Sequence, residues 1–130
     1  APDQVSKLDR KIYNSNNVMA KGLSVSNKNI AISYFIFAIE ALVEKENDDK
    51  HNGIIKCVSY RTAKILSNTD NSKSKDYYIK KFKKLYDIRS KFVHNGDYEF
   101  KRIIKSKVVF AWLSAFNVLI YYAKKILANS

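Results

Sequence analysis

The sequence predicts an all-α fold, a helical bundle of about five helices. Three observations support this prediction. The 130 residues contain only three Gly and one Pro, too few for the many turns of an all-β protein. That single proline is Pro2, so nothing after it prevents long helices. Apolar residues make up 46% of the chain and charged residues 28%, which is an ordinary globular composition.

The length of the chain suits one domain with a sizeable core, so residues 1–130 are expected to form a single helical domain. The start at Ala1-Pro2-Asp3, without an initiator Met, fits a processed end or a domain excised from a longer protein. Cys57 is the only cysteine, which excludes an intramolecular disulfide and a Cys-based metal cluster. We therefore expect a reducing, cytoplasmic location, with no metal and no other cofactor.

The first expected helix covers residues 3 to about 25, where Val5, Leu8 and Ile12 have the spacing of one buried helical stripe. The polar run 14–17 and Gly22 leave its continuity open. Ser26 or Asn27 can cap the next helix.

Residues 30–43 are apolar at nearly every position, a pattern typical of the central, buried helix of a bundle. This run is too short to span a membrane, and we expect no membrane partner. Glu40 lies inside it. Because an isolated buried carboxylate is costly, Glu40 is expected to have a structural partner, either a cation or a backbone group from another helix.

Three more helices are expected in the second half of the chain. Apolar spacing marks the third around residues 54–66, and a polar linker follows at 67–72. The fourth runs from about Lys75 to His94 and is ended by Asn95-Gly96. The fifth follows Asp97 and runs to about Leu127. The short turn between the last two predicts that they pack antiparallel.

The charge of the chain is strongly positive, with 24 Lys and Arg against 12 Asp and Glu and a formal net charge of +12. Such a charge favours a polyanionic partner, most simply nucleic acid. An A+T-rich genome would also give a Lys-rich composition without any binding role.

The end of the fourth helix carries residues that suit RNA cleavage without a metal. His94 has the right ordinary pKa to move protons near neutral pH. Arg89 can hold two phosphate oxygens and offset the charge that develops on the phosphate. Ser90 could orient the phosphate or the histidine. Other interpretations are that His94 is a cation at the helix C-terminus, and that Arg89 is the partner of Glu40.

Helical geometry places Arg89 and His94 roughly 140° apart around an ideal helix. They do not converge within one subunit unless the last turn is distorted. A symmetric dimer, in which two copies of this helix meet at a two-fold axis, would bring two Arg and two His into one cleft.

Two stretches of the sequence resemble HEPN domains, most closely the Apea-like branch. One is the apolar helix Phe35-Ile36-Phe37-Ala38-Ile39-Glu40-Ala41-Leu42. The other is Tyr86-Asp87-Ile88-Arg89-Ser90-Lys91-Phe92-Val93-His94-Asn95-Gly96, similar to the family motif of an Arg, four to six residues and a His near the end of a late helix. Ser90 stands where the family often has Asn, Asp or His, and His-Asn-Gly replaces the more usual His-Gly.

The resemblance implies a metal-independent endoribonuclease that acts as a homodimer, as in toxins and anti-phage systems. Arg89, His94 and Ser90 would form the catalytic set. The side chains expected to hold RNA are Lys81, Lys84, Lys91 and Asn95. The alternatives are a non-catalytic RNA- or nucleotide-binding module and a protein-interaction domain, whose partner would be an antitoxin or a fused domain. Tyr60, Tyr77, Tyr78 and Tyr86 could stack on bases, although packing in the core explains most of them better.

Overall fold

The chain is seen here in a computed structural model that describes the backbone of residues 2–43, 54–69, 72–95 and 105–129. Side chains are described for residues 7–43, 56–69, 72–89 and 105–128. The described residues form five α-helices and no strand, which confirms the predicted all-α helical bundle. The helices are α1 (Pro2–Ser24), α2 (Lys28–Leu42), α3 (Ile54–Thr69), α4 (Lys75–Asn95) and α5 (Lys105–Asn129).

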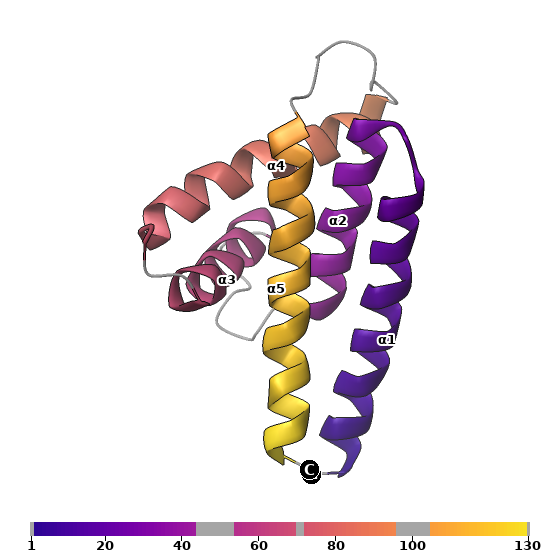
Figure 1. The fold of residues 1–130 in the computed structure, drawn as a ribbon, viewed down its shortest axis with the longest axis vertical. Coiled ribbons are helices and arrows are strands. Elements are labelled where there is room, and N and C mark those ends of the chain that lie inside the picture. The colour runs from indigo at the N-terminus through magenta and orange to yellow at the C-terminus, as the bar shows by residue number, and fades with distance from the viewer. Residues whose placement is uncertain (1, 44–53, 70–71, 96–104, 130) are drawn as a thin grey trace.

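Three of the helices lie side by side along the long axis of the molecule: α1, α2 and α5 (Figure 1). The other two, α3 and α4, pack on each other and cover one side of that layer (Figure 1). α2 is the central helix, in contact with α1, α4 and α5. Its side chains Ile32, Ile36 and Ile39 are fully buried, as expected for a helix that is apolar all round.

α1 is continuous through the polar run 14–17. This segment therefore forms a single helix, a point that the sequence had left open. Ser15 is buried and its hydroxyl donates to the Ala38 carbonyl of α2 at 2.7 Å. The Asn residues around it are exposed. The polar run therefore interrupts the apolar stripe without interrupting the helix, because its one inward-facing residue finds a hydrogen-bond partner.

The start of α2 is set by Asn27, whose side-chain oxygen accepts from the Ile30 backbone N–H at 3.1 Å. This is the N-cap arrangement that the sequence allowed for either Ser26 or Asn27. The cap fixes where the chain turns from the end of α1 into α2.

The expected antiparallel packing of the fourth and fifth helices is wrong. α4 runs obliquely across one end of the bundle instead of alongside α5 (Figure 1), and it packs chiefly on α3 and α2. The expected start of the fifth helix after Asp97 lies outside the described residues, and α5 is described from Lys105 onward. The apolar face of α4, which includes Phe82, Leu85 and Tyr86, is buried in the main core.

One helix is long and apolar enough to cross a membrane by length and composition, over Lys105–Ala128 with a mean hydropathy of 1.3. Core helices of soluble proteins pass the same test. Only 22% of the window in α5 is buried, but a single helix of this kind is weak evidence, so this finding does not assign it to a membrane.

Gly22 of α1 packs directly against the Phe35 ring of α2. A Cβ at this position would lie 2.7 Å from Cε1 of Phe35, which is itself buried in the core. Gly22→Ala should therefore lower the free energy of unfolding by about 1–3 kcal/mol, because overpacking outweighs the gain in helix propensity. Urea unfolding followed by circular dichroism measures this change. The exposed control Asn16→Ala should be neutral or slightly stabilising, and an equal gain in stability for Gly22→Ala would show that the two helices are not this close.

Candidate functional site

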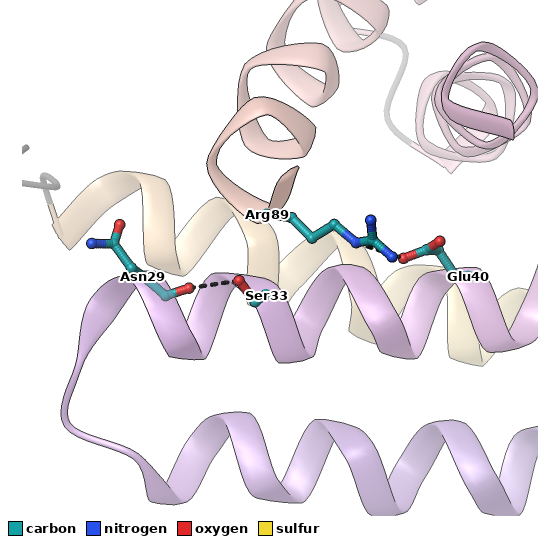
Figure 2. Close-up of polar contacts among 4 residues, drawn as sticks. All are labelled: Asn29, Ser33, Glu40 and Arg89. Carbon is teal, nitrogen blue, oxygen red and sulfur yellow. Dashed lines mark hydrogen bonds and ion pairs between the residues drawn. The ribbon is translucent and has the colours of Figure 1, made fainter. Parts of the chain in front are cut away.

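The candidate site is centred on an ion pair between α4 and α2. Arg89 Nε lies 3.3 Å from Glu40 Oε1, and Figure 2 shows the Arg89 side chain extending from α4 toward α2. The side chains are 24% and 17% exposed, respectively, so the pair is half-buried and reaches the surface. Neither of the two atoms makes a hydrogen bond to a described residue, so the contact is electrostatic.

Two aromatic rings flank the same guanidinium. Arg89 Cζ lies 5.0 Å from the centroid of the Phe37 ring and 5.6 Å from that of Tyr86. Both distances fit cation–π contacts, which favour a guanidinium over an ammonium. Burial, and then the neighbouring Glu40 carboxylate, raise the pKa of Tyr86 above its ordinary value, so its hydroxyl remains neutral. Arg89 is thus held by one carboxylate and two rings.

Sequence reasoning missed the two rings, although the spacing contained the signal. Phe37 and Glu40 are three residues apart on α2, and Tyr86 and Arg89 are three apart on α4. Residues three apart share a helix face. Once α2 and α4 are in contact, each helix therefore presents one ring and one charge to the other.

A buried hydroxyl of α2, drawn with the pair in Figure 2, already has a hydrogen-bond partner. The Ser33 hydroxyl donates to the backbone carbonyl of Asn29 at 2.9 Å, and both residues are buried (Figure 2). A hydroxyl bonded to the preceding helical turn serves the helix and is not an activated nucleophile.

In this arrangement Arg89 can still bind an anion. A guanidinium carries several N–H donors in a fixed plane, and its Nε edge faces Glu40 here. Donors on the terminal nitrogens can still engage a phosphate oxygen. The carboxylate fixes the orientation of the guanidinium, and it also offsets part of its positive charge.

The other catalytic candidates lie in α4, but their side chains fall outside the described residues. These are Ser90 and His94, and the same holds for the RNA-binding candidates Lys91 and Asn95. The backbone of α4 continues to Asn95, so His94 belongs to the last turn of the helix, as predicted. The pairing of Arg89 with His94 and the dimer stay predictions.

The remaining RNA-binding candidates, Lys81 and Lys84, lie elsewhere on α4. Lys81 precedes Arg89 by eight positions, which is about 12 Å along a helix. Both lysines line a hollow between α4 and α5. They therefore form a separate group from the ion pair.

The four tyrosines considered for base stacking divide into two pairs. Tyr78 and Tyr86 are buried core residues, whereas Tyr60 and Tyr77 are exposed. Lys75 Nζ donates to the Tyr60 hydroxyl at 3.1 Å, and this hydrogen bond lowers the pKa of Tyr60. Among the described residues, no three His, Cys, Asp or Glu side chains gather where they could hold a metal ion.

Comparison with known proteins found no match among family models, curated proteins or solved structures. The resemblance to HEPN domains therefore rests on the residues of the two stretches quoted above.

The ion pair predicts coupling between its two residues. Glu40→Ala and Arg89→Ala should each lower the free energy of unfolding by about 1–3 kcal/mol, because each leaves a half-buried charge without its partner. The double substitution should cost less than the sum of the two, by about 1 kcal/mol. Urea unfolding of the four proteins gives this cycle, with the exposed Lys83→Ala as a control. Simple additivity would show that the pair contributes nothing as a pair.

Proposed function

We propose that this chain is a metal-independent endoribonuclease of HEPN type, which cleaves single-stranded RNA at a site shared between two copies of the chain. A role in a toxin or anti-phage system is part of this proposal. The observation that supports it best is the fixed Arg89 guanidinium, held at the protein surface near the end of α4 by Glu40, Phe37 and Tyr86. The net charge of +12 suits a polyanionic substrate.

In the proposed reaction, the 2′-hydroxyl of one nucleotide attacks the adjacent phosphorus and the bond to the 5′-oxygen of the next nucleotide breaks. His94 transfers the protons: one leaves the attacking hydroxyl and one is delivered to the leaving oxygen. Donors of Arg89 bind the phosphate oxygens as negative charge develops on them. Ser90 assists in orienting the phosphate. The products are a 2′,3′-cyclic phosphate and a 5′-hydroxyl.

In this mechanism Glu40 is a positioning residue. It lies on the Nε edge of Arg89 at 3.3 Å and keeps the plane of the guanidinium in one orientation. A preorganised donor does not have to reorient during the reaction, which is the source of its catalytic value. Two copies are part of the proposal because an ideal helix would place Arg89 and His94 roughly 140° apart.

A second candidate function is RNA binding without cleavage. The same Glu40 carboxylate favours this alternative, because a negative charge 3.3 Å from Arg89 weakens the attraction of the guanidinium for a phosphate. Exposed lysines along α4, including Lys83 and Lys84, would then hold the RNA backbone. Such binding weakens with salt at a log–log slope of about −0.7 for each phosphate contacted.

Cleavage of a fluorescent single-stranded RNA in the presence of EDTA tests the proposal. His94→Ala and Arg89→Ala should each reduce the rate at least about 100-fold, whereas the exposed control Lys124→Ala should leave it within about twofold. His94→Ala is the more informative variant, because Arg89→Ala also exposes Glu40. If both variants cleave at the wild-type rate, the nuclease site is wrong. If the wild-type protein binds the RNA without cleaving it, the second function is correct.

A mixing experiment tests the shared site. In a mixed dimer of Arg89→Ala with His94→Ala, the shared cleft would contain one intact Arg89 from one copy and one intact His94 from the other, where the wild type has two of each. Each mixed dimer should therefore have up to about half of the activity of a wild-type dimer, although neither variant is active alone. No recovery, with subunit exchange verified by differently tagged copies, would contradict a site built from two chains.

A further inference from the structure

The outward side of α5 carries exposed apolar side chains in a row that begins and ends with a lysine. The row consists of six residues at steps of three and four, which is the spacing of one helix face: Lys105, Val109, Leu113, Phe116, Ile120 and Lys124. We call it the α5 stripe. Val109, Leu113 and Phe116 are 41%, 43% and 41% exposed, and Ile120 is half-buried. The stripe covers about 28 Å of helix, and α5 runs along the long axis of the molecule (Figure 1).

The opposite side of α5 holds the helix in the bundle. Ala111, Ala115 and Val118 belong to the main core and are no more than 1% exposed. A helix that serves only the core keeps its apolar residues on that side and turns polar residues to the solvent. α5 has apolar residues on both sides. Its stripe is therefore a second apolar surface that the packing of the bundle does not use.

A residue of α1 widens this surface at the Lys105 end of the stripe. Leu23 is 60% exposed and lines, together with Val109 and Trp112, a hollow of about 220 Å³. Lys28, the first residue of α2, lines the same hollow. Contiguous exposed apolar residues generally mark an interaction surface, whereas scattered ones do not. The surface thus extends over two helices, with a further lysine beside it.

The charges on and around the stripe are mainly basic. α5 contains four lysines and no acidic residue, and residues 108–123 are uncharged. The described side chains of α1, which packs beside α5, include four basic residues and one acidic residue, Asp9. Two stripes facing each other would bring lysines together whether the helices were parallel or antiparallel, which disfavours a second copy as the occupant. The charge pattern favours an occupant that is both anionic and apolar.

We propose that the α5 stripe docks the protein on an anionic lipid surface. Val109, Leu113 and Phe116 would enter the boundary between headgroups and acyl chains, and Lys105 and Lys124 would lie next to lipid phosphates. Helices that lie in the membrane interface combine an apolar side with lysines in this way. The long apolar stem of a lysine lets its ammonium reach the phosphates while the neighbouring side chains are inserted. α5 would lie on the bilayer without crossing it, because its other side stays in the core.

A lipid surface suits the stripe better than a partner protein does. Protein interfaces form hydrogen bonds throughout their area, about one for each 100–200 Å². Between Lys105 and Lys124 the stripe has no side chain that can form a hydrogen bond. A bilayer needs none there, because its polar groups are confined to the headgroups. This proposal replaces the expectation of no membrane partner, which rested on the apolar run 30–43, and it does not depend on RNA cleavage.

Flotation of the full chain with lipid vesicles tests the proposal. Vesicles of phosphatidylglycerol and phosphatidylcholine in equal amounts should bind the protein at least about tenfold more tightly than vesicles of phosphatidylcholine alone, because several lysines contribute at an anionic surface. Trp112 is the only tryptophan of the chain and lines the hollow beside Val109. Its fluorescence should shift to the blue on binding and should be quenched by brominated acyl chains.

Matched variants separate docking through the stripe from the general attraction of a basic protein to anionic lipid. Leu113→Ser and Phe116→Ser should each weaken binding to the anionic vesicles about fivefold to tenfold, because each removes inserted apolar area. Tyr60→Ser makes the same kind of change on α3, where the ring is 48% exposed, and should bind like the wild type.

The lysines give a second comparison. Lys105→Ala and Lys124→Ala should each weaken binding to the anionic vesicles about threefold to fivefold, whereas Lys83→Ala on α4 should stay within about twofold. Circular dichroism verifies that every variant is folded.

Three results would overturn the proposal. If both serine variants of the stripe bind as tightly as the wild type, the attraction is purely electrostatic and the stripe is not the docking surface. If the wild type binds neither kind of vesicle, the surface is left for a partner protein. If sedimentation velocity shows that Phe116→Ser dissociates an oligomer of the wild type, a second copy covers the stripe.

Discussion

α2 has apolar side chains in every direction, so every side of it has to be covered by another helix. α1, α4 and α5 each cover part of it, and α3 reaches the core mainly through α4 and α5. The one carboxylate of α2 lies inside this arrangement, because Glu40 faces the end of α4. Burial of a carboxylate in such a place is tolerated only where a cation lies opposite. The position of Arg89 is thus set by the packing of the core before any question of function arises.

The same contact has two opposite effects on the proposed role of Arg89. Glu40 and the rings of Phe37 and Tyr86 hold the guanidinium rigidly, which suits a group that must meet a phosphate at a fixed place. The carboxylate also offsets its charge, which weakens its attraction for that phosphate. Lys81 and Lys84, which line the hollow between α4 and α5, differ in this respect, because no acidic residue lines that hollow. The proposed binding of RNA by these lysines would therefore not depend on the ion pair.

The helices could be predicted from the sequence because each follows from local spacing, and the central position of α2 followed from its uniform apolar character. The direction of α4 could not be predicted. Residues 67–72 and 95–97 both look like turns, and nothing in them shows that α4 crosses the bundle instead of running along α5. The need of Glu40 for a cation was visible in the sequence, and so was Arg89 as one candidate. The rings around Arg89 and the gathering of Lys107 with the lysines of α4 depend on which helices meet, which is a property of the tertiary fold.

The half-buried ion pair also restricts the order in which this chain can change during evolution. A switch from the charged pair to two apolar residues passes through a protein that has lost only one of them, and that intermediate carries an unpaired charge between α2 and α4. Each single substitution in the pair lowers stability, and that loss alone would be selected against. Arg89 would therefore be retained for stability whether or not the chain acts on RNA, and its presence in a related sequence would not by itself mark an active enzyme. His94, the proposed proton-transfer residue, would be the residue to inspect first.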